Sequence, residues 1–362
     1  PIEVIEMFKQ LLEHKTYNDR VEIREKYRDN IRFGIKGEFD TLSSETIKNY
    51  LVSLKKHLIK SLQNLFDESQ GIIPTFLRYE VDDYNFIKDQ NGKNLFYKDY
   101  KLVKPLTYNR KALAPFLEAP ARLLKTSINQ DKLIKMHKLI KKSNIYDEKL
   151  NMYKTSAPLD NESHEIGRIH AFTKGWLERE SNFLHMTYKY LLGLIKAGLY
   201  DEFYKEIKDN LVCFMDPAIY RRSTLENSSF IATSNNPDPN IHGKGFFARL
   251  SGSTVEAVNM WSIMMTGGHP FKYENGQLVL EFEPKLHYTF FKNNRISFNF
   301  LKEIEITYIT NELVNTYDEL KVNKIELLGG DEKVVIKDSR IQGQHALDIR
   351  NGLYKRINIY IN

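Results

Sequence analysis

The apolar residues of this chain change their spacing near residue 270, and this change limits the folds open to it. Before that point they recur at three and four residues, as in the stretch SSETIKNYLVSLKKHLIKSLQNLF. After Phe271, apolar and polar residues alternate, as in QLVLEFEP and KRINIYI. The first spacing is typical of amphipathic helices and the second of half-buried strands. The sequence therefore predicts a mainly α-helical domain over residues 1–270, followed by an antiparallel, sandwich-like β domain over residues 271–362.

The helical region has one interruption, over residues about 72–108. This stretch carries Pro74, alternating apolar residues and the pair Asn91-Gly92. Asn-Gly is favoured in tight hairpin turns, so we expect an extended insertion with a hairpin. The chain also begins in helical phase at Ile2, without a methionine. We therefore expect the helices to be the C-terminal portion of a longer domain.

Composition and charge limit the class of partner. The 53 basic and 47 acidic residues leave a net charge of +6, which is scattered and forms no basic block, so we expect no nucleic-acid partner. No apolar run approaches the roughly 18 residues of a membrane span, so we expect no membrane contact. The single cysteine, Cys213, cannot form a disulfide within the chain. This favours a reducing, cytoplasmic compartment.

One candidate site lies in the stretch HGKGFFARLSGSTVEAVNMW, residues 242–261. Ser251 and Gly252 stand at the start of a predicted helix that ends at Gly267-Gly268. A helix start offers unpaired N–H groups that suit an anion, and Lys244 and Arg249 would add positive charge. The alternative is a serine cap with solvated basic neighbours. The residues alone leave both interpretations open.

A second candidate lies in GWLERESNFLHMTYKYL, residues 175–191. Glu178, Glu180 and His185 fall near the start of a helix that we predict to begin at Glu180. They could face a cleft, or they could be a capping carboxylate and a half-buried structural histidine. Glu226 lies in a predicted loop, where binding residues are common. The histidines form no metal-binding motif, and we expect neither a metal nor an organic cofactor.

Taken together, these stretches resemble the cellobiose-phosphorylase family of inverting glycoside phosphorylases. The similarity is carried by GWLE, LENSSFIA, NPDP, HGKGF and RLSGST, which occur in the same order, within residues 165–270. The family has an (α/α)6 barrel followed by a β domain. The resemblance implies phosphorolysis of β-linked gluco-oligosaccharides, with inorganic phosphate as co-substrate and a sugar 1-phosphate as product.

The resemblance also implies roles for single residues. His185, Ser251 and Gly252 match the family's phosphate-binding positions, and Glu178 matches a glutamate beside the sugar. Glu180, Glu226 and Arg249 are further candidates for substrate binding. If the match holds, His185 and Ser251 should line one pocket.

The sequence departs from the family at two places. The family's general acid is an Asp in an Asp-Trp-Asn-Asp motif, which neither Trp176 nor Trp261 belongs to, and two motif glycines are replaced by Glu180 and Ser181. The general acid is thus expected on an N-terminal portion of the protein, or it has been lost. The alternative function is a non-catalytic carbohydrate-binding or assembly protein with the same fold. Whether the protein forms a homodimer stays open.

Overall fold

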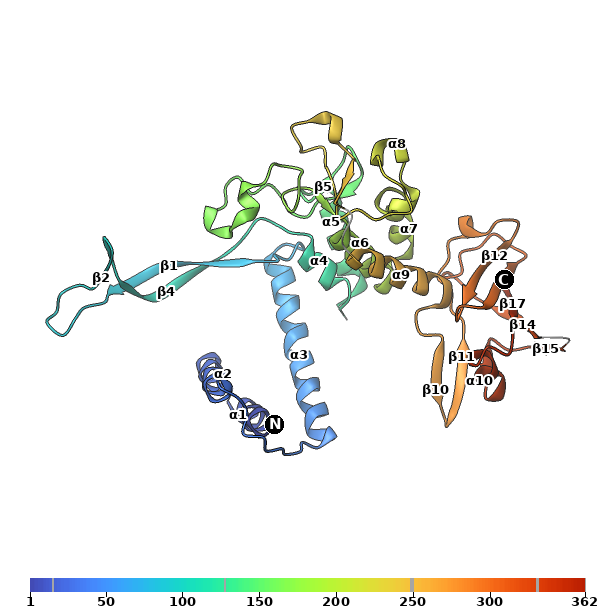
Figure 1. The fold of residues 1–362 in the computed structure, drawn as a ribbon, viewed down its shortest axis with the longest axis horizontal. Coiled ribbons are helices and arrows are strands. Elements are labelled where there is room, and N and C mark those ends of the chain that lie inside the picture. The colour runs from blue at the N-terminus through green and yellow to red at the C-terminus, as the bar shows by residue number, and fades with distance from the viewer. Residues whose placement is uncertain (15, 127, 248–250, 330–331, 362) are drawn as a thin grey trace. The chain divides into compact units, whose positions relative to one another are not determined.

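The computed structural model describes residues 1–14, 16–126, 128–247, 251–329 and 332–361 (Figure 1). The described chain forms two compact units, Pro1–Glu68 and Ser69–Asn362. Each unit is described by itself below.

The first unit is helical, as the apolar spacing predicts. It contains α1 (Ile2–Glu13), α2 (Tyr17–Ile31) and α3 (Ser44–Glu68). The hydroxyl of Ser43 accepts a hydrogen bond from the Thr46 N–H at 3.1 Å, which caps the start of α3. Phe8 of α1 contacts Tyr50 of α3 edge to face.

The second unit begins with the predicted hairpin. Its long strands are β1 (Leu77–Phe86) and β4 (Val103–Ala112), which pair antiparallel, with the short strands β2 (Phe96–Tyr97) and β3 (Tyr100–Lys101) near the tip. The turn closes with a hydrogen bond from the Gly92 N–H to the Asp89 carbonyl. The expected extended insertion is therefore confirmed, and its second strand continues four residues past Tyr108.

A group of helices forms the centre of the second unit. α6 lies in its middle and packs against α4, α7 and α9 (Figure 1). A Cβ added at Gly193 of α6 would lie 2.7 Å from the Leu124 Cβ, so the glycine permits close approach. The α-helices are α4 (Glu118–Leu123), α5 (Gln130–Lys141), α6 (Leu184–Lys196), α7 (Tyr200–Asn210), α8 (Pro217–Tyr220) and α9 (Ser251–Thr266). α9 ends before Gly267-Gly268, as predicted.

Short elements connect these helices. The prediction that the helix of α6 begins at Glu180 is wrong, because Asn182 and Phe183 pair with Ile231 and Phe230 of a neighbouring strand. The strands are β5 (Tyr146–Asp147), β6 (Met152–Tyr153), β7 (Asn182–Phe183), β8 (Phe230–Ile231) and β9 (Gly245–Phe246). The 3₁₀ turns are η1 (His164–Ile166), η2 (Arg168–Ala171), η3 (Val212–Phe214) and η4 (Pro239–Ile241).

A buried polar network lies between α5, α6 and α7. The Nδ1 atom of His137 is 2.9 Å from the Tyr190 hydroxyl, and its Nε2 atom is 3.8 Å from Oε1 of Glu206. Glu206 also accepts a hydrogen bond from Lys141 at 2.7 Å. Burial, with a smaller contribution from Lys141, lowers the pKa of His137 from 6.5 to about 4. The imidazole is therefore neutral at physiological pH.

The C-terminal strands begin at Phe271, where the alternating pattern begins, but they belong to the same compact unit, Ser69–Asn362, as the central helices. One sheet has the order β10-β11-β16 and the other the order β12-β13-β17-β14-β15. Phe282, which follows β11, contacts Phe300 and Tyr308 of the larger sheet. The elements are β10 (Phe271–Glu274), β11 (Gln277–Glu281), η5 (Tyr288–Phe290), β12 (Arg295–Phe300), β13 (Ile304–Thr310), β14 (Val322–Gly329), β15 (Glu332–Ile336), β16 (Arg340–Gln342), α10 (Gln344–Arg350) and β17 (Arg356–Ile361).

One expectation for this domain is wrong. It is not wholly antiparallel, because β13 and β17 pair in parallel, with Ile306 opposite Ile357. A parallel pair needs a long crossover connection, and here the chain passes through β14, β15, β16 and α10 between the two strands.

The architecture is a mixture of helices and sheets. The helices do not close into a barrel within the residues that the structure describes. None of the described helices is both long enough and apolar enough to span a bilayer. Cys213 lies in η3 and is exposed.

Candidate functional site

The starts of α6 and α9 meet at a glycine–histidine contact. His185 is the second residue of α6 and Gly252 the second residue of α9. A Cβ added at Gly252 would lie 2.5 Å from Cε1 of His185 and 2.7 Å from both ring nitrogens. The imidazole therefore fills the space that a side chain at Gly252 would need. The fold brings together two residues that are far apart in sequence but were expected in one pocket.

The surroundings of His185 are mainly positive. Burial lowers the pKa of its imidazole, and Lys189 contributes next in the same direction. Glu256 opposes this shift with a carboxylate 3.9 Å from Nε2, and Lys125 lowers the pKa further. Two lysines and one glutamate thus act on the ring. An anion near Nε2 would meet a net positive field, but it would compete with the Glu256 carboxylate for interaction with Nε2.

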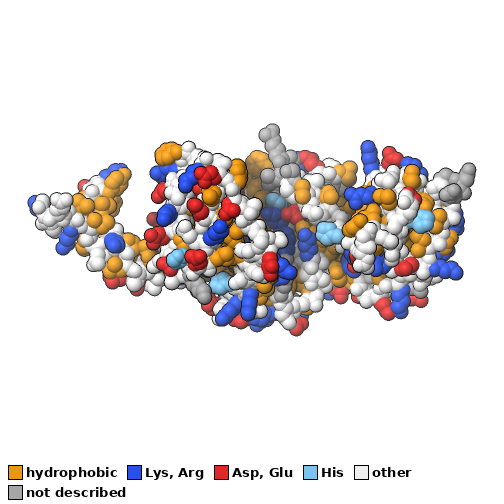
Figure 2. All heavy atoms as spheres, turned by 90° about the horizontal axis from the view of Figure 1, so that it is seen from below, with side chains coloured by type: hydrophobic (Ala, Val, Ile, Leu, Met, Phe, Trp, Pro, Cys, Tyr) orange, Lys and Arg blue, Asp and Glu red, His pale blue; other side chains and the backbone are white. Residues whose placement is uncertain are grey.

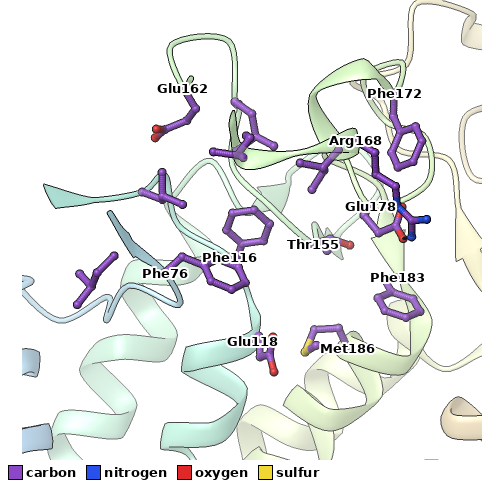
Figure 3. A pocket seen from close by; sticks show the side chains of 15 residues that line it. Phe76, Phe116, Glu118, Thr155, Glu162, Arg168, Phe172, Glu178, Phe183 and Met186 are labelled. Atoms are coloured by element: carbon purple, nitrogen blue, oxygen red, sulfur yellow. Dashed lines mark hydrogen bonds and ion pairs between the residues drawn. The ribbon is translucent and has the colours of Figure 1, made fainter. Parts of the chain in front are cut away.

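A cavity of about 480 Å³ lies near the start of α6; its described wall includes Phe183 and Met186 but neither His185 nor Gly252 (Figure 3). Aromatic and aliphatic side chains form most of its wall. Phe76 and Phe116 are in edge-to-face contact, with ring centroids 5.1 Å apart, on one side of the cavity in Figure 3. Arg168, Glu178 and Phe183 lie on the other side. The cavity therefore has an apolar end and a more polar end.

Phe183 and Met186 connect the cavity to His185. Both line the cavity, and His185 lies between them in the sequence. The rings of Phe183 and His185 meet edge to face, with centroids 5.9 Å apart. This contact links one residue of the cavity wall to His185, and no described residue of α9 lines the cavity.

Three glutamates line the cavity, and each has an arginine partner. The Arg168–Glu178 pair is the one at the polar end, where Arg168 is largely exposed. A carboxylate oxygen that is not used by the arginine can accept hydrogen bonds from sugar hydroxyls. The pairs are Glu118 with Arg122 at 2.6 Å, Glu162 with Arg78 at 3.5 Å and Glu178 with Arg168 at 3.4 Å.

Glu180 lies behind the cavity wall and is almost fully buried. Its Oε2 accepts a hydrogen bond from Asn235, whose own Oδ1 is 3.3 Å from Nζ of Lys154. Its Oε1 has no hydrogen-bond partner within the described part of the chain, and Nε of Arg179 is 4.0 Å away. Of the two glutamates in the stretch 178–180, Glu178 alone lines the cavity.

Three other predicted residues have different positions. Glu226 forms an ion pair with Arg222 at 2.9 Å and does not line the cavity. α9 begins at Ser251, but the side chain of Ser251 lies outside the described part of the structure. Arg249 lies outside the described residues altogether. The expected pairing of His185 with Ser251 is therefore seen only through the backbone neighbour Gly252.

Sequence reasoning named Asn227 in a candidate loop but missed its contacts, and it missed several other residues around this site. Asn227 connects its loop to both helices, because it accepts a hydrogen bond from Tyr188 of α6 at 2.9 Å and donates one to Thr254 of α9 at 3.3 Å. Lys125 and Phe116 come from segments with no recognisable motif. No periodic pattern marks such residues, since their roles depend on contacts between distant segments.

Part of the family-like pattern has a packing explanation. Gly175, in the GWLE stretch, has φ +67° and faces the backbone of Asn236, where an added Cβ would lie 2.5 Å from the nitrogen. Gly245, in the HGKGF stretch, faces the ring of Tyr220, and an added Cβ would overlap it. These glycines maintain the loops around the site and need not contact a ligand.

Comparisons with known proteins add no assignment. No model of a known protein family matches the chain, and no protein of curated function matches it. Within the described residues, no group of three or more His, Cys, Asp and Glu side chains could hold a metal ion. The function therefore has to be argued from the geometry around His185 and the cavity.

Proposed function

We propose that this chain is the C-terminal part of an inverting glycoside phosphorylase-like protein. It would act on β-linked gluco-oligosaccharides with inorganic phosphate and release a sugar 1-phosphate. The observation that carries the proposal is the packing of His185 on Gly252 at the start of α9, beside a cavity that contains Glu178. The exposed single cysteine, Cys213, is compatible with a reducing compartment such as the cytoplasm.

Phosphate would bind where α6 and α9 meet. The first N–H groups of a 16-residue helix and its dipole favour an anion, and Gly252 permits the close approach of the His185 ring. His185 would donate a hydrogen bond, with Lys125 and Lys189 contributing positive charge. A phosphate attacking an anomeric carbon is already anionic and needs such donors rather than a general base. No further cofactor is required by this chemistry.

The sugar would occupy the polar end of the cavity. Glu178, held by Arg168, offers carboxylate oxygens to hydroxyl groups, and Phe183 offers an apolar surface to a sugar ring. Inversion also requires a carboxylic acid that protonates the leaving oxygen. We place that acid on an additional N-terminal portion of the protein.

The outer side of α9 supports the idea of additional helices. Val255, Val258 and Trp261 recur every three residues on this helix and are all exposed. Exposed apolar side chains at helical spacing are typical of a helix–helix interface. Helices that pack there would extend the described helices towards an (α/α)6 barrel.

The alternative is a non-catalytic carbohydrate-binding or assembly protein. The observation in its favour is that each glutamate of the described cavity wall is paired with an arginine, so this wall offers no carboxyl group without a cationic partner. In this case phosphate and sugar would bind without reaction.

Phosphate titration tests the proposed anion site. We expect weak binding by the wild-type chain and about tenfold weaker binding by His185→Ala, because a charge-assisted or neutral hydrogen bond at the site is lost. Isothermal titration calorimetry at low ionic strength measures the effect. His345→Ala, in α10, is the matched control and should bind as the wild type does. Equal affinities of the His185 variant and the wild type would refute the site.

A second prediction concerns turnover. The chain alone should release no glucose 1-phosphate from β-linked gluco-oligosaccharides, because a positioned acid contributes roughly 10²–10⁴-fold in rate. Adding the N-terminal portion should restore release if the protein is an enzyme. The assay is the formation of glucose 1-phosphate from a panel of β-glucans. Turnover by this chain alone that disappears in Glu178→Gln or Glu180→Gln would contradict the prediction.

A further inference from the structure

We infer that the cavity beside His185 accepts a β-glucoside whose aglycone is apolar, such as an aryl group, in preference to a second sugar ring. This inference rests on the proposed function, keeps its β-glucoside and phosphate, and replaces the second sugar of the oligosaccharide with an apolar aglycone. The sugar would occupy the end near Glu178 and Phe183, and the aglycone the end near Phe76 and Phe116 (Figure 3).

The apolar end has the composition of an aryl-binding site. Phe76 and Phe116 meet edge to face, with an interplanar angle of 89°, and Leu77 and Leu113 complete the wall. Aromatic rings favour edge-to-face and offset contacts with another ring. An aryl group placed here would bury apolar surface on both partners.

The polar groups near the apolar end are already engaged. Both carboxylate oxygens of Glu162 have partners, because Oε1 accepts a hydrogen bond from the Ala114 N–H at 2.8 Å and Oε2 is 3.5 Å from Arg78. Glu178, by contrast, pairs within the described residues with Arg168 through Oε1 alone. Thr155 donates its hydroxyl proton to the Ser181 carbonyl at 2.9 Å. The hydroxyl groups of a second sugar would therefore lose water with few new partners, which is unfavourable. An apolar aglycone carries no such cost.

The same pairing argues against an organic cation as the ligand. Aromatic rings with nearby carboxylates can bind ammonium groups. Here, however, each glutamate in the wall has a guanidinium partner, so the cavity offers little net negative charge. Shape and apolar surface remain as the main sources of selectivity at this end.

The position of the cavity relative to His185 sets the direction of the ligand. Phe183 contacts both the cavity and the His185 ring. The sugar must lie near the phosphate, since phosphate attacks its anomeric carbon. The aglycone therefore extends away from α9, towards the base of the β1–β4 hairpin, where Phe76 precedes β1 and Leu113 follows β4.

The test compares the binding of phenyl β-D-glucoside, methyl β-D-glucoside, cellobiose and phenol to the intact chain by calorimetry. We expect phenyl glucoside to bind at least tenfold more tightly than each of the other three. Phe76→Ala should remove most of this preference, and Phe76→Tyr should retain it, because the ring remains. Phe96→Ala is the matched control, since Phe96 is an exposed aromatic residue of the hairpin outside the cavity.

Three results would overturn the inference. Equal affinity for phenyl and methyl glucosides would show that the apolar end is unused. If cellobiose binds more tightly than phenyl glucoside, the apolar end binds a second sugar. If phenol binds as tightly as phenyl glucoside or more tightly, the sugar contributes nothing to binding in this cavity. Failure of the proposed function gives a different result from failure of this inference. It would leave the phosphate affinity of His185→Ala equal to that of the wild type, whichever glucoside binds more tightly.

Discussion

Replacing Gly252 by alanine is expected to abolish phosphate binding at the start of α9 and to displace the imidazole of His185. The new Cβ would lie 2.5–2.7 Å from three ring atoms, which is well inside van der Waals contact. The ring is the end of a side chain and is partly exposed, so it would rotate towards solvent. The site would therefore lose its histidine donor.

The measurements are calorimetric titration with phosphate and NMR titration of the His185 ring. Because burial is the main cause of the lowered pKa of His185, its pKa should rise when the ring moves into water. We also expect the free energy of unfolding to fall by about 1–3 kcal/mol, as for other overpacked sites. The double variant His185→Ala/Gly252→Ala should regain stability, because the overlap with the ring is gone, but it should not regain phosphate binding. Wild-type phosphate affinity in Gly252→Ala would rule out the site as proposed.

Acidification is expected to destabilise the second unit through His137. The pKa of this residue falls from 6.5 in the unfolded chain to about 4 in the folded one. Between these values the unfolded state binds more protons, so folding stability is lost as the pH falls from about 6.5 to about 4 and changes no further below that. A difference of about 2.5 pKa units corresponds to about 3 kcal/mol.

Urea unfolding followed by tryptophan fluorescence measures this loss. Both Trp176 and Trp261 belong to the same unit as His137. His137→Gln keeps a polar group beside Tyr190 but does not titrate, so its stability should depend less on pH. The gap in stability between wild type and variant should narrow as the pH falls. A gap that stays constant from pH 7.5 to pH 4 would show that His137 does not cause the loss.

Acidic and basic side chains are both spread over the face shown in Figure 2. The modest net charge of +6 is therefore not concentrated there in the way that a nucleic-acid interface requires. The expectation that nucleic acid is no partner remains a prediction. The anion site proposed here depends on local groups around His185 instead of on a broad basic surface.

The sequence alone determined the regular elements of the fold. The apolar spacing predicted α3, and the alternation predicted a β domain from Phe271. The Asn91-Gly92 pair marked the hairpin, and Gly267-Gly268 marked the end of α9. These features follow from interactions within a few residues, because periodicity and turn preference are local properties.

The candidate site was only partly visible in the sequence. His185, Gly252 and Glu178 were singled out by their resemblance to a family pattern; the structure brings His185 against Gly252 and places Glu178 in the cavity wall. The sequence did not separate Glu178, which lines the cavity, from Glu180, which is buried against Asn235. The two glutamates are only two residues apart, but the backbone turns between them, so one carboxylate lines the cavity and the other is buried.

Tertiary structure alone decided the remaining features. Phe183 joins a strand instead of a helix because it pairs with Phe230, 47 residues later, and β17 runs parallel to β13 because the connection between them crosses over. The contact of His185 with Gly252 depends on how α6 packs against α9. Such choices depend on the free energy of contacts between distant segments, which the local pattern of residues around each segment does not contain.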